Sequence, residues 1–452
     1  MTVVTIILGL LGLGVVVFFH ELGHFAMSRL VGVDVEEFSL GWGPRIVSRK
    51  IGKTAYTLSA LPIGGYCRMK GEDSYRKAIE QGLDEFPRES GTYFGASPIR
   101  RIMIAFGGPL MNVVFAFAVY VVIMAAGYDT HSWDNRIILA SEYDGGSYPA
   151  DSAGLRSGDR IVSIDGQSIS SFSEIQESIS LSAKKPIEVS VDRGGIPVGI
   201  HIRPELDKES GAGRVGVYPW IEPVVAAVVP SGPAALAGLR PGDRILSVGG
   251  IPVSHTIALM SWLEAEKPSR ADVRYSRDGA QSDATLVLSY QAGAGVDLGL
   301  GWESRVSTVR ANGIGEALSM GFSETGKTIS ATYRGLASLF MGVNLLKAVS
   351  GPARITWMVG TVAKNGLSGQ SADGMSVALN FLAILSIGLF AMNLLPIPLL
   401  DGGSILLFVI ELVRRKAAKV KTVLRYQTIG MIAVAALFLL STVGDVLFFS
   451  GK

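Results

Sequence analysis

The residues best suited to chemistry begin at His20, where His20-Glu-Leu-Gly-His24 follows eighteen uncharged residues, Thr2 to Phe19. On a helix, His20 and His24 lie four positions apart and share one face, so both imidazoles can reach one metal ion. Glu21 lies beside them, where it can take a proton from a water that the metal binds. A charged hydrolytic site at the end of an apolar segment is costly, so its presence here indicates function rather than a chance match.

A third ligand is needed, because a catalytic zinc has three protein ligands and one open position. Asp401 lies in Asn393-Leu-Leu-Pro-Ile-Pro-Leu-Leu-Asp-Gly-Gly403 and would complete a set of two histidines and one aspartate. We expect Pro396 and Pro398 to break a helix here, and the two glycines to let the backbone approach the metal. The alternative is that Asp401 only caps a helix end. Its expected depth in the membrane, equal to that of the His-Glu motif, favours the ligand.

The elements that must position these residues are membrane spans. Hydrophobic residues make up 48 % of the 452 residues and charged residues 18 %, with a mean hydropathy of +0.37. The first span lacks the basic start and small-residue cleavage site of a signal peptide. The single cysteine excludes an intrachain disulfide, and the net charge of +2 gives no indication of a nucleic-acid partner. Four segments are long and apolar enough to span a bilayer, at about 2–19, 102–126, 375–400 and 429–449.

Basic residues predict the orientation of these spans. Twelve Lys and Arg residues lie between Arg29 and Arg101, and six more lie between Arg414 and Arg425. Both segments are expected to be cytosolic, which places both termini and residues 127–374 on the other side. The first and third spans then run in the same direction. Their C-terminal ends, with the His-Glu motif and Asp401, are expected to meet near the cytosolic face.

The long segment between the second and third spans contains a duplication. Residues 153–166 recur 84 residues later at 237–250, with ten of fourteen positions identical. The pattern Ala-Gly-Leu-x-x-Gly-Asp-x-Ile resembles bacterial PDZ domains, which can bind peptides by strand addition. A steric filter that binds no defined peptide is the other role, and both stay open. Within residues 313–367 we expect an amphipathic helix that lies on the outer membrane surface or packs on the repeats.

Taken together, these motifs resemble the site-2 protease family of intramembrane metalloproteases. The resemblance covers nearly the whole chain and includes Pro62-Ile-Gly-Gly-Tyr-Cys-Arg-Met69 and Gly107-Gly-Pro-Leu-Met-Asn112. It implies a Zn²⁺ ion held by the residues already singled out, with Glu21 as the base. The metal ligands that it implies are His20, His24 and Asp401.

Six further residues are candidates for substrate binding: Gly64, Gly65, Asn112, Asn393, Pro396 and Pro398. From the residues alone, Gly64-Gly65 indicates a hairpin turn in the cytosolic loop, and Asn112 a polar contact with a neighbouring helix. The resemblance implies a membrane-reentrant β-loop at Gly64-Gly65, whose edge pairs with unwound substrate. It also implies that Asn112 lies near the substrate or the catalytic water. Asn393 has the same two interpretations. Its closeness to Pro396 and Pro398 favours substrate contact.

The predicted fold class is a polytopic α-helical membrane protein with four spans, two extracytosolic α/β PDZ domains and a reentrant β-loop. The expected order is a first span at 1–30, a cytosolic region with the β-loop at 31–98, a second span at 99–127, PDZ domains at 128–220 and 221–308, a periplasmic region with amphipathic helices at 309–374, a third span at 375–405, a cytosolic loop at 406–428 and a fourth span at 429–452.

The predicted function is that of an intramembrane zinc endopeptidase in the inner membrane of a bacterium, with the PDZ domains in the periplasm. By resemblance, its substrates are single-pass membrane proteins, including a trimmed anti-sigma factor of the envelope stress response and signal-peptide remnants. The PDZ domains would then act as a size filter. The partners are these substrates and the lipid bilayer. Two other functions compete with this prediction. The complete set of ligands argues against a PDZ scaffold with a vestigial metal site. The clustering of the ligands at one face of the membrane argues against a metal-ion transporter.

Overall fold

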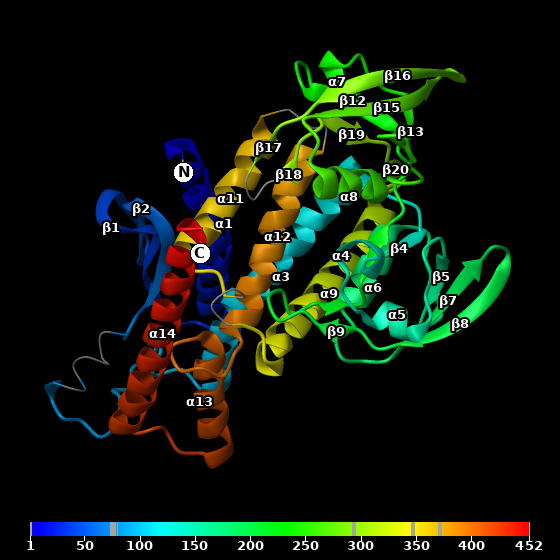
Figure 1. Cartoon of the computed structure of the whole chain (residues 1–452). Helices are drawn as coiled ribbons and strands as arrows, with labels where there is room; N and C mark the ends of the chain where they lie inside the picture. Colours follow the sequence, from blue (N-terminus) through cyan, green and yellow to red (C-terminus); the bar gives the residue numbers. More distant parts are fainter. Residues whose placement is uncertain are drawn as a thin grey trace. The chain divides into compact units, whose positions relative to one another are not determined.

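The structure is a computed structural model that describes residues 2–72, 78, 80–291, 295–344, 349–368 and 373–451. Its contacts divide the chain into two compact units. The helical unit consists of residues 1–128 and 309–452, and the sheet unit of residues 129–308. In Figure 1 the sheet unit is the part drawn from cyan-green to yellow-green.

Among the described residues, four helices of the helical unit are long and apolar enough to cross a membrane. They agree with the four predicted spans by length and composition. Thr2 caps the first of them by accepting a hydrogen bond from the backbone N–H of Thr5, and Pro98 begins the second, where a missing N–H costs nothing. The four helices are α1 (Val3–Leu30), α3 (Pro98–Ala126), α12 (Gly374–Asn393) and α14 (Val420–Phe449).

Helices α1 and α3 cross at a pair of glycines. A Cβ on Gly23 would lie 2.1 Å from the carbonyl oxygen of Gly107, and a Cβ on Gly107 would lie 2.6 Å from that of Gly23. Only glycine allows two backbones to approach this closely. The crossing holds the His-Glu motif of α1 against the first half of α3.

Two further helices of the helical unit, α9 (Ile314–Ser338) and α11 (Pro352–Leu367), pack on the spans. Helix α9 contacts α3 and α12, and α11 lies along α1. A Cβ on Gly360 of α11 would lie 1.8 Å from the carbonyl oxygen of Thr5, and one on Gly9 would lie 2.0 Å from that of Thr356. Glycines on both helices therefore allow α11 to pack closely against α1. The position of an amphipathic helix on the membrane surface stays a prediction.

Helix α14 is joined to α11 through a carboxylate. Buried Asp445 accepts hydrogen bonds from the backbone N–H groups of Gly351, Ala353 and Arg354 at 2.8, 2.9 and 3.2 Å. These N–H groups at the start of α11 have no partner within the helix, and the helix dipole favours a negative charge there. Asp445 is therefore a buried charge whose hydrogen bonds are satisfied, and it fixes the end of α14.

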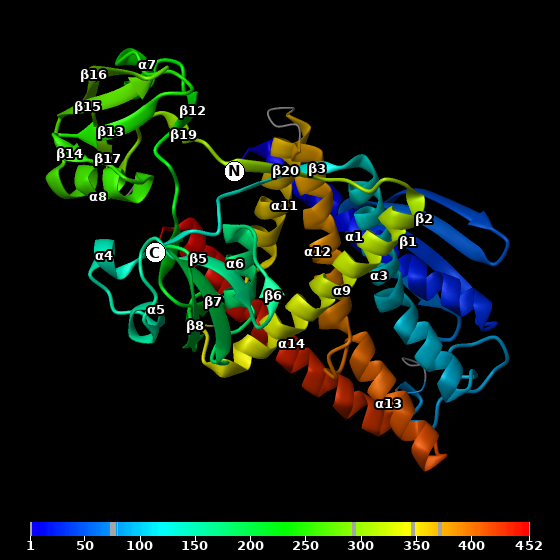
Figure 2. The same cartoon turned by 90° about the vertical axis from the view of Figure 1, so that its right-hand side faces the viewer.

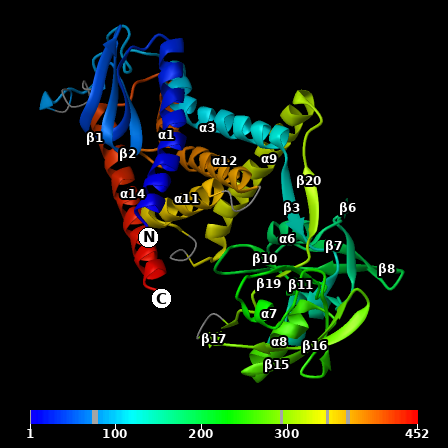
Figure 3. The ribbon, with the colours of Figure 1, turned by 90° about the horizontal axis from the view of Figure 1, so that it is seen from above.

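Strands β1 (Val35–Ile51) and β2 (Thr54–Met69) form a sheet beside α1 (Figure 3). Residues 35–40 pair with 65–69 on one side and with 55–58 on the other, and residues 45–51 pair with 54–59. Residues 65–69 are thus one edge of the sheet in the described part of the chain.

The turn between β1 and β2 lies at residues 52–53, and Gly64 and Gly65 lie inside β2. The pairing nevertheless shows a second reversal of the chain, because residues 55–58 run parallel to 37–40 whereas residues 65–69 run antiparallel to 35–40. Gly64 and Gly65 lie at the end of this reversal, and Gly64 has a φ of +86°, which only glycine adopts readily. A turn in the region of Gly64-Gly65, as predicted from the sequence, agrees with this pairing.

The predicted third span, 375–405, is divided in two. Helix α12 ends at Asn393, residues 394–400 are not helical, and Asp401 begins a new helix, α13 (Asp401–Arg414). Pro396 and Pro398 account for the break, because proline has no backbone N–H to continue a helix. The segment expected as a cytosolic loop, 406–428, thus contains most of α13 and the start of α14.

The sheet unit contains two four-stranded sheets with the same strand order, each with its own helix and its own apolar core (Figure 2). The sequence duplication is therefore a structural repeat. The first repeat holds β6 (Gln167–Ser168), β5 (Arg160–Ile164), β7 (Ile187–Arg193), β8 (Ile196–Ile202) and α6 (Phe172–Ser180); the second holds β14 (Ile251–Pro252), β13 (Arg244–Val248), β15 (Arg270–Arg277), β16 (Ala280–Val287) and α8 (Thr256–Glu266).

The Gly-Asp-Arg sequence common to both copies supports the fold of each repeat. Asp159 accepts two hydrogen bonds from Arg193, both at 2.8 Å, and Asp243 accepts two from Arg277, both at 2.7 Å. Each aspartate is buried and binds an arginine at the end of the third strand of its sheet. The duplicated motif is therefore structural rather than catalytic.

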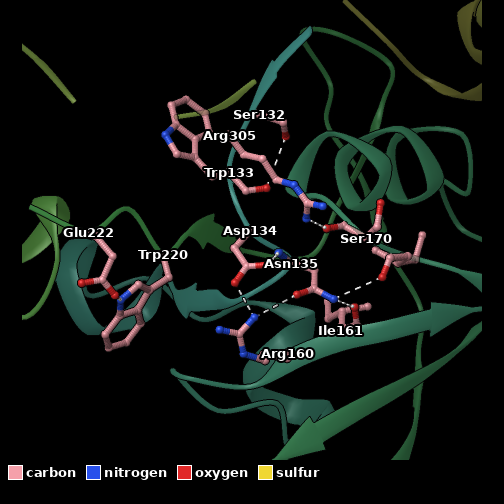
Figure 4. A network of polar contacts seen from close by, with 11 residues as sticks. Ser132, Trp133, Asp134, Asn135, Arg160, Ile161, Ser170, Trp220, Glu222 and Arg305 are labelled. Atoms are coloured by element: carbon pink, nitrogen blue, oxygen red, sulfur yellow. Dashed lines mark hydrogen bonds and ion pairs between the residues drawn. The ribbon is translucent and has the colours of Figure 1, made fainter. Parts of the chain in front are cut away.

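Further hydrogen bonds join the segments that enter and leave the sheet unit to the first repeat (Figure 4). Asn135 donates to the carbonyl oxygens of Ile161 and Ile169 at 2.8 and 3.1 Å, and Arg305 donates to that of Ser170 at 3.5 Å. The shorter elements are β3 (Tyr128–Ser132) paired with β20 (Arg305–Val309), β4 (Ile137–Leu139) with β11 (Val217–Pro219), β9 (Glu205–Leu206) with β10 (Gly213–Arg214), β12 (Val225–Val228) with β19 (Leu300–Trp302), β17 (Tyr290–Gln291) with β18 (Gly295–Val296), and the helices α4 (Ser141–Asp144), α5 (Pro149–Ala153), α7 (Pro233–Leu236) and η1 (Leu339–Met341).

Candidate metal centre

Three potential metal ligands lie together in the helical unit. The Nε2 atoms of His20 and His24 are 3.2 Å apart, and both side chains are buried. Asp401, at the first position of α13, places one carboxylate oxygen 3.3 Å from Nε2 of His20 and the other 3.5 Å from Nε2 of His24. The structure thus brings together the two histidines and the sequence-distant aspartate, whose ligand atoms all lie within 4.8 Å of one another.

These distances fit a zinc ion. Ligand atoms bound tetrahedrally at about 2.1 Å from zinc would be about 3.4 Å apart. The two Nε2 atoms are 3.2 Å apart, and Nε2 of His20 is 3.3 Å from Oδ2 of Asp401, whereas the 3.5 Å contact of His24 is with Oδ1. Oδ2 of Asp401 is buried and makes no hydrogen bond in the described part of the chain. A buried carboxylate oxygen without a partner is costly, and a cation at this point would satisfy it.

Each histidine is oriented by a group on α3. Nδ1 of His24 lies 2.9 Å from the carbonyl oxygen of Ile104, so it carries the proton and leaves Nε2 free to bind metal. The side-chain amide of fully buried Asn112 lies 3.1 Å from Nδ1 of His20. If Nε2 of His20 binds metal, Nδ1 must donate, and the amide must face it with its oxygen. That orientation also gives a partner to Oδ1 of Asn112, which otherwise has none among the described residues.

Gly108 of α3 lies directly against the two imidazoles. A Cβ at this position would lie 2.3 Å from Nε2 of His24 and 2.8 Å from Cε1 of His20. Sequence analysis included Gly108 in a motif without giving it a role, and it missed the Ile104 carbonyl. Consecutive glycines within an apolar span were the available signal, since small residues mark close approach between helices. A backbone carbonyl has no sequence signal.

Glu21 lies next to the edge of β2. A Cβ on Gly65 would lie 3.4 Å from Cγ of Glu21. Residues 65–69 pair with 35–40 on one side only in the described part of the chain, so their outward backbone groups can accept another strand. The candidate base therefore lies between the histidines on α1 and a free strand edge.

Three other candidate substrate-binding residues lie at the end of α12 or just after it. Nδ2 of Asn393 is 3.5 Å from Nε2 of His20, which places this side chain beside the metal centre. Pro396 and Pro398 belong to the connection at 394–400. The Pro398 carbonyl oxygen packs against α14, where a Cβ on Gly430 would come within 2.3 Å of it.

The two glycines that follow Asp401 have a different role from the one expected. A Cβ on Gly402 would lie 2.2 Å from the carbonyl oxygen of Leu394, and one on Gly403 would lie 2.2 Å from that of Ile397. The expectation that they bring the backbone to the metal is wrong. They allow the first turn of α13 to pack on the preceding connection, and this packing positions Asp401.

Comparison with known proteins identifies the family of this chain. The model of peptidase family M50 matches residues 8–438. The chain belongs to this family. This M50 chain is 37 % identical to a protein of Treponema pallidum, over 98 % of the chain and 99 % of that protein, and 30 % identical to one of Borreliella burgdorferi, over 97 % and 98 %. Both relatives are named "Putative zinc metalloprotease".

Two solved structures match short parts of the M50 chain. The PDZ domain of an SdrC-like protein from Listeria monocytogenes aligns with 19 % of this chain and 90 % of its own length, at 17 % identity and a TM-score of 0.17. A protein from Geobacillus thermodenitrificans aligns with 18 % of the chain and 95 % of its own length, at 32 % identity and a TM-score of 0.16.

Family membership and the metal centre agree. The M50 chain is a zinc metalloprotease and a membrane protein, which confirms the resemblance to site-2 proteases and the zinc cofactor predicted from the sequence.

Proposed function

We propose that this zinc metalloprotease cleaves single-pass membrane proteins within the membrane, at a segment that pairs with the edge of β2. The position of Glu21 carries this proposal. It follows His20 on α1, and its side chain lies against Gly65 at the free edge. A substrate strand added to that edge would have its backbone beside both the base and the metal centre.

The side chains at the site suit hydrolysis of a peptide bond. His20, His24 and Asp401 would hold a zinc ion, which would supply a Lewis acid for water and the scissile carbonyl. Glu21 accepts the proton of the attacking water and then donates a proton to the leaving amine. Asn393 lies beside His20, where its amide can donate a hydrogen bond to substrate.

The strand edge also answers a difficulty of intramembrane cleavage. A peptide bond in a helix is shielded, because its N–H and C=O groups bond within the helix. Once the substrate helix unwinds, these groups need new partners, since lipid supplies none. The outward backbone groups of residues 65–69 can supply them.

The orientation and location that we propose follow from charge. The basic residues at 29–101 and 414–425 support a metal centre near the cytosolic face and a sheet unit on the outer side of the inner membrane. In this orientation, a trimmed anti-sigma factor and signal-peptide remnants are the substrates that the family resemblance suggests. Each presents a membrane span with little mass outside.

We propose that the two repeats of the sheet unit are PDZ domains that reject substrates with a bulky outer domain. Peptide binding stays a second possible role. A cavity of about 450 Å³ in the first repeat lies between α6, with Phe172, Ile175 and Ile179, and residues 213–219. Its size falls within the roughly 300–1,000 Å³ of small-ligand sites.

The test of the proposed activity is cleavage of a single-pass substrate by the purified full chain. Glu21→Gln should retain zinc and lose cleavage, because the amide cannot accept the proton of the attacking water. Glu264→Gln, at an exposed carboxylate of α8, is the control and should cleave normally. Normal cleavage by the Glu21→Gln variant would refute the role of Glu21.

The filter has its own test. Wild type and a variant lacking residues 129–308 should be compared on one substrate with and without a folded outer domain. If the sheet unit is a size filter, only the shortened variant should cleave the substrate with the folded outer domain. Adding Glu21→Gln to the shortened variant should abolish that cleavage. Continued rejection of the bulky substrate by an active shortened variant would contradict the filter.

A further inference from the structure

An apolar cavity of about 300 Å³ opens between α1 and the β1–β2 sheet. We call it the Phe18 cavity. Its volume is at the lower end of the roughly 300–1,000 Å³ of small-ligand sites, so it suits one large side chain better than a whole ligand. The residues that line it are Leu11, Gly14, Val15, Phe18, Phe19, Leu40 and Gly64.

The Phe18 cavity lies on the same face of α1 as the candidate base. Gly14, Phe18 and Glu21 are spaced i, i+4 and i+7, which places them on one side of the helix. With a rise of about 1.5 Å per residue, Phe18 is about 4.5 Å and Gly14 about 10 Å from Glu21 along the helix axis. The cavity therefore begins one helical turn from the base.

The Phe18 cavity also reaches the free strand edge. Gly64, in its wall, directly precedes Gly65, which lies against Glu21. Gly64 has no side chain, and a Cβ there would already lie 3.3 Å from Nε1 of Trp42. A strand added to the edge at residues 65–69 would thus pass from the base toward the mouth of the cavity.

We propose that the Phe18 cavity receives one apolar side chain of the substrate and so selects the cleavage site. The inference rests on the proposed function. An extended strand rises about 3.3 Å per residue, so the 4.5–10 Å separation places the selected residue one to three positions from the scissile bond. Side chains alternate along a strand, so one residue faces the cavity while its neighbours point away. Continuity with the edge beside Glu21 favours a peptide over a lipid chain as the occupant.

The test is a substrate series cleaved by the detergent-solubilised full chain. Each of the three residues on either side of the scissile bond is changed in turn to Ala, Leu or Phe. At one of these six positions, Leu or Phe should be cleaved about 10-fold faster than Ala, as is typical of an apolar pocket that loses a few carbons. The other five positions should show smaller effects.

Variants of the cavity must change this preference at the same position. Gly14→Leu fills the cavity and should remove or reverse the preference, whereas Phe18→Ala enlarges it and should favour Phe over Leu. Ile7→Ala is the matched control, because Ile7 is an exposed apolar residue of α1 outside the cavity wall, and it should leave the preference unchanged. Zinc content should stay the same in all three variants.

The outcomes separate the two proposals. If wild type cleaves no membrane substrate, the proposed function fails. If it cleaves but Gly14→Leu and Phe18→Ala alter no positional preference, or slow every substrate equally, the Phe18 cavity is not a side-chain subsite. If Gly14→Leu does not fold, Phe18→Ala alone decides between these results.

Discussion

Replacing Gly108 by Ala should destroy the metal centre through a single methyl group. The new Cβ would lie 2.3 Å from Nε2 of His24, about 1.1 Å short of the 3.4 Å at which ordinary contact begins. Moving α3 away from α1 to make room would open the close packing of Gly107 on the Gly23 backbone, so the clash falls on the imidazole. Metal–ligand distances hold to within about 0.2 Å, so an imidazole displaced by about 1 Å cannot remain a ligand.

The expected loss is large, since mutation of groups that only orient a ligand already weakens metal binding by about 10–100-fold. We predict at least about 100-fold weaker zinc binding for Gly108→Ala, measured by competition with a chromogenic chelator, and loss of cleavage. Gly388→Ala on α12 is the matched control, because a Cβ there meets no atom within 4 Å. It should keep wild-type zinc affinity. If Gly108→Ala binds zinc as tightly as Gly388→Ala, the geometry described for the centre is wrong.

Three further predictions concern Asn112 and two ion pairs. Asn112→Leu removes the acceptor for Nδ1 of His20 and should weaken zinc binding about 10–100-fold in the same competition assay. Asn112→Asp keeps an acceptor and should retain most of the zinc affinity. Equal zinc affinity of the two variants would contradict the role of Asn112. Arg101→Met leaves the buried carboxylate of Glu411, 2.5 Å away, without its arginine partner. It should destabilise the helical unit by about 3–5 kcal/mol in thermal unfolding, and adding Glu411→Leu should restore the stability. Asp243→Asn should cost the sheet unit about 1.5–3 kcal/mol at pH 7 in urea unfolding. Burial acts to raise the pKa of Asp243, but hydrogen bonds from Arg277 and the Arg240 backbone hold it below its ordinary value. The stability that ionised Asp243 contributes is therefore complete above about pH 4, the usual pKa of an unfolded aspartate, and is lost as the pH falls further. If the stability of Asp243→Asn falls as much as that of wild type on acidification, this role of Asp243 is refuted.

The chemistry of the site was predictable where it depends on short-range spacing. Two histidines four residues apart share a helix face in any helix, so His20 and His24 could be paired before the fold was known. The approach of Asp401 followed from the direction of two spans, which the basic residues indicated. The helix break at Pro396 and Pro398 followed from the missing N–H of proline.

Features that depend on contacts between distant elements could not be predicted in this way. Gly108 is one of 55 glycines, and only the crossing of α1 and α3 shows that it touches both imidazoles. The free edge at residues 65–69 depends on which segment pairs on each side of residues 35–40. The close packing of α11 on α1 depends on Gly9 and Gly360, whose contacts local spacing does not indicate. In each case the feature arises from tertiary packing.

The central claim is that His20, His24 and Asp401 hold one zinc ion. Zinc K-edge X-ray absorption of the purified Glu21→Gln variant, with zinc stoichiometry from the same sample, tests it most directly. The account predicts one zinc per chain with nitrogen and oxygen ligands at about 2.0–2.2 Å, two of them imidazoles, and loss of that zinc in the double variant with His24→Ala and Asp401→Ala. A sulfur ligand at about 2.3 Å, which only Cys67 or a methionine could supply, or full zinc retention in the double variant, would contradict it.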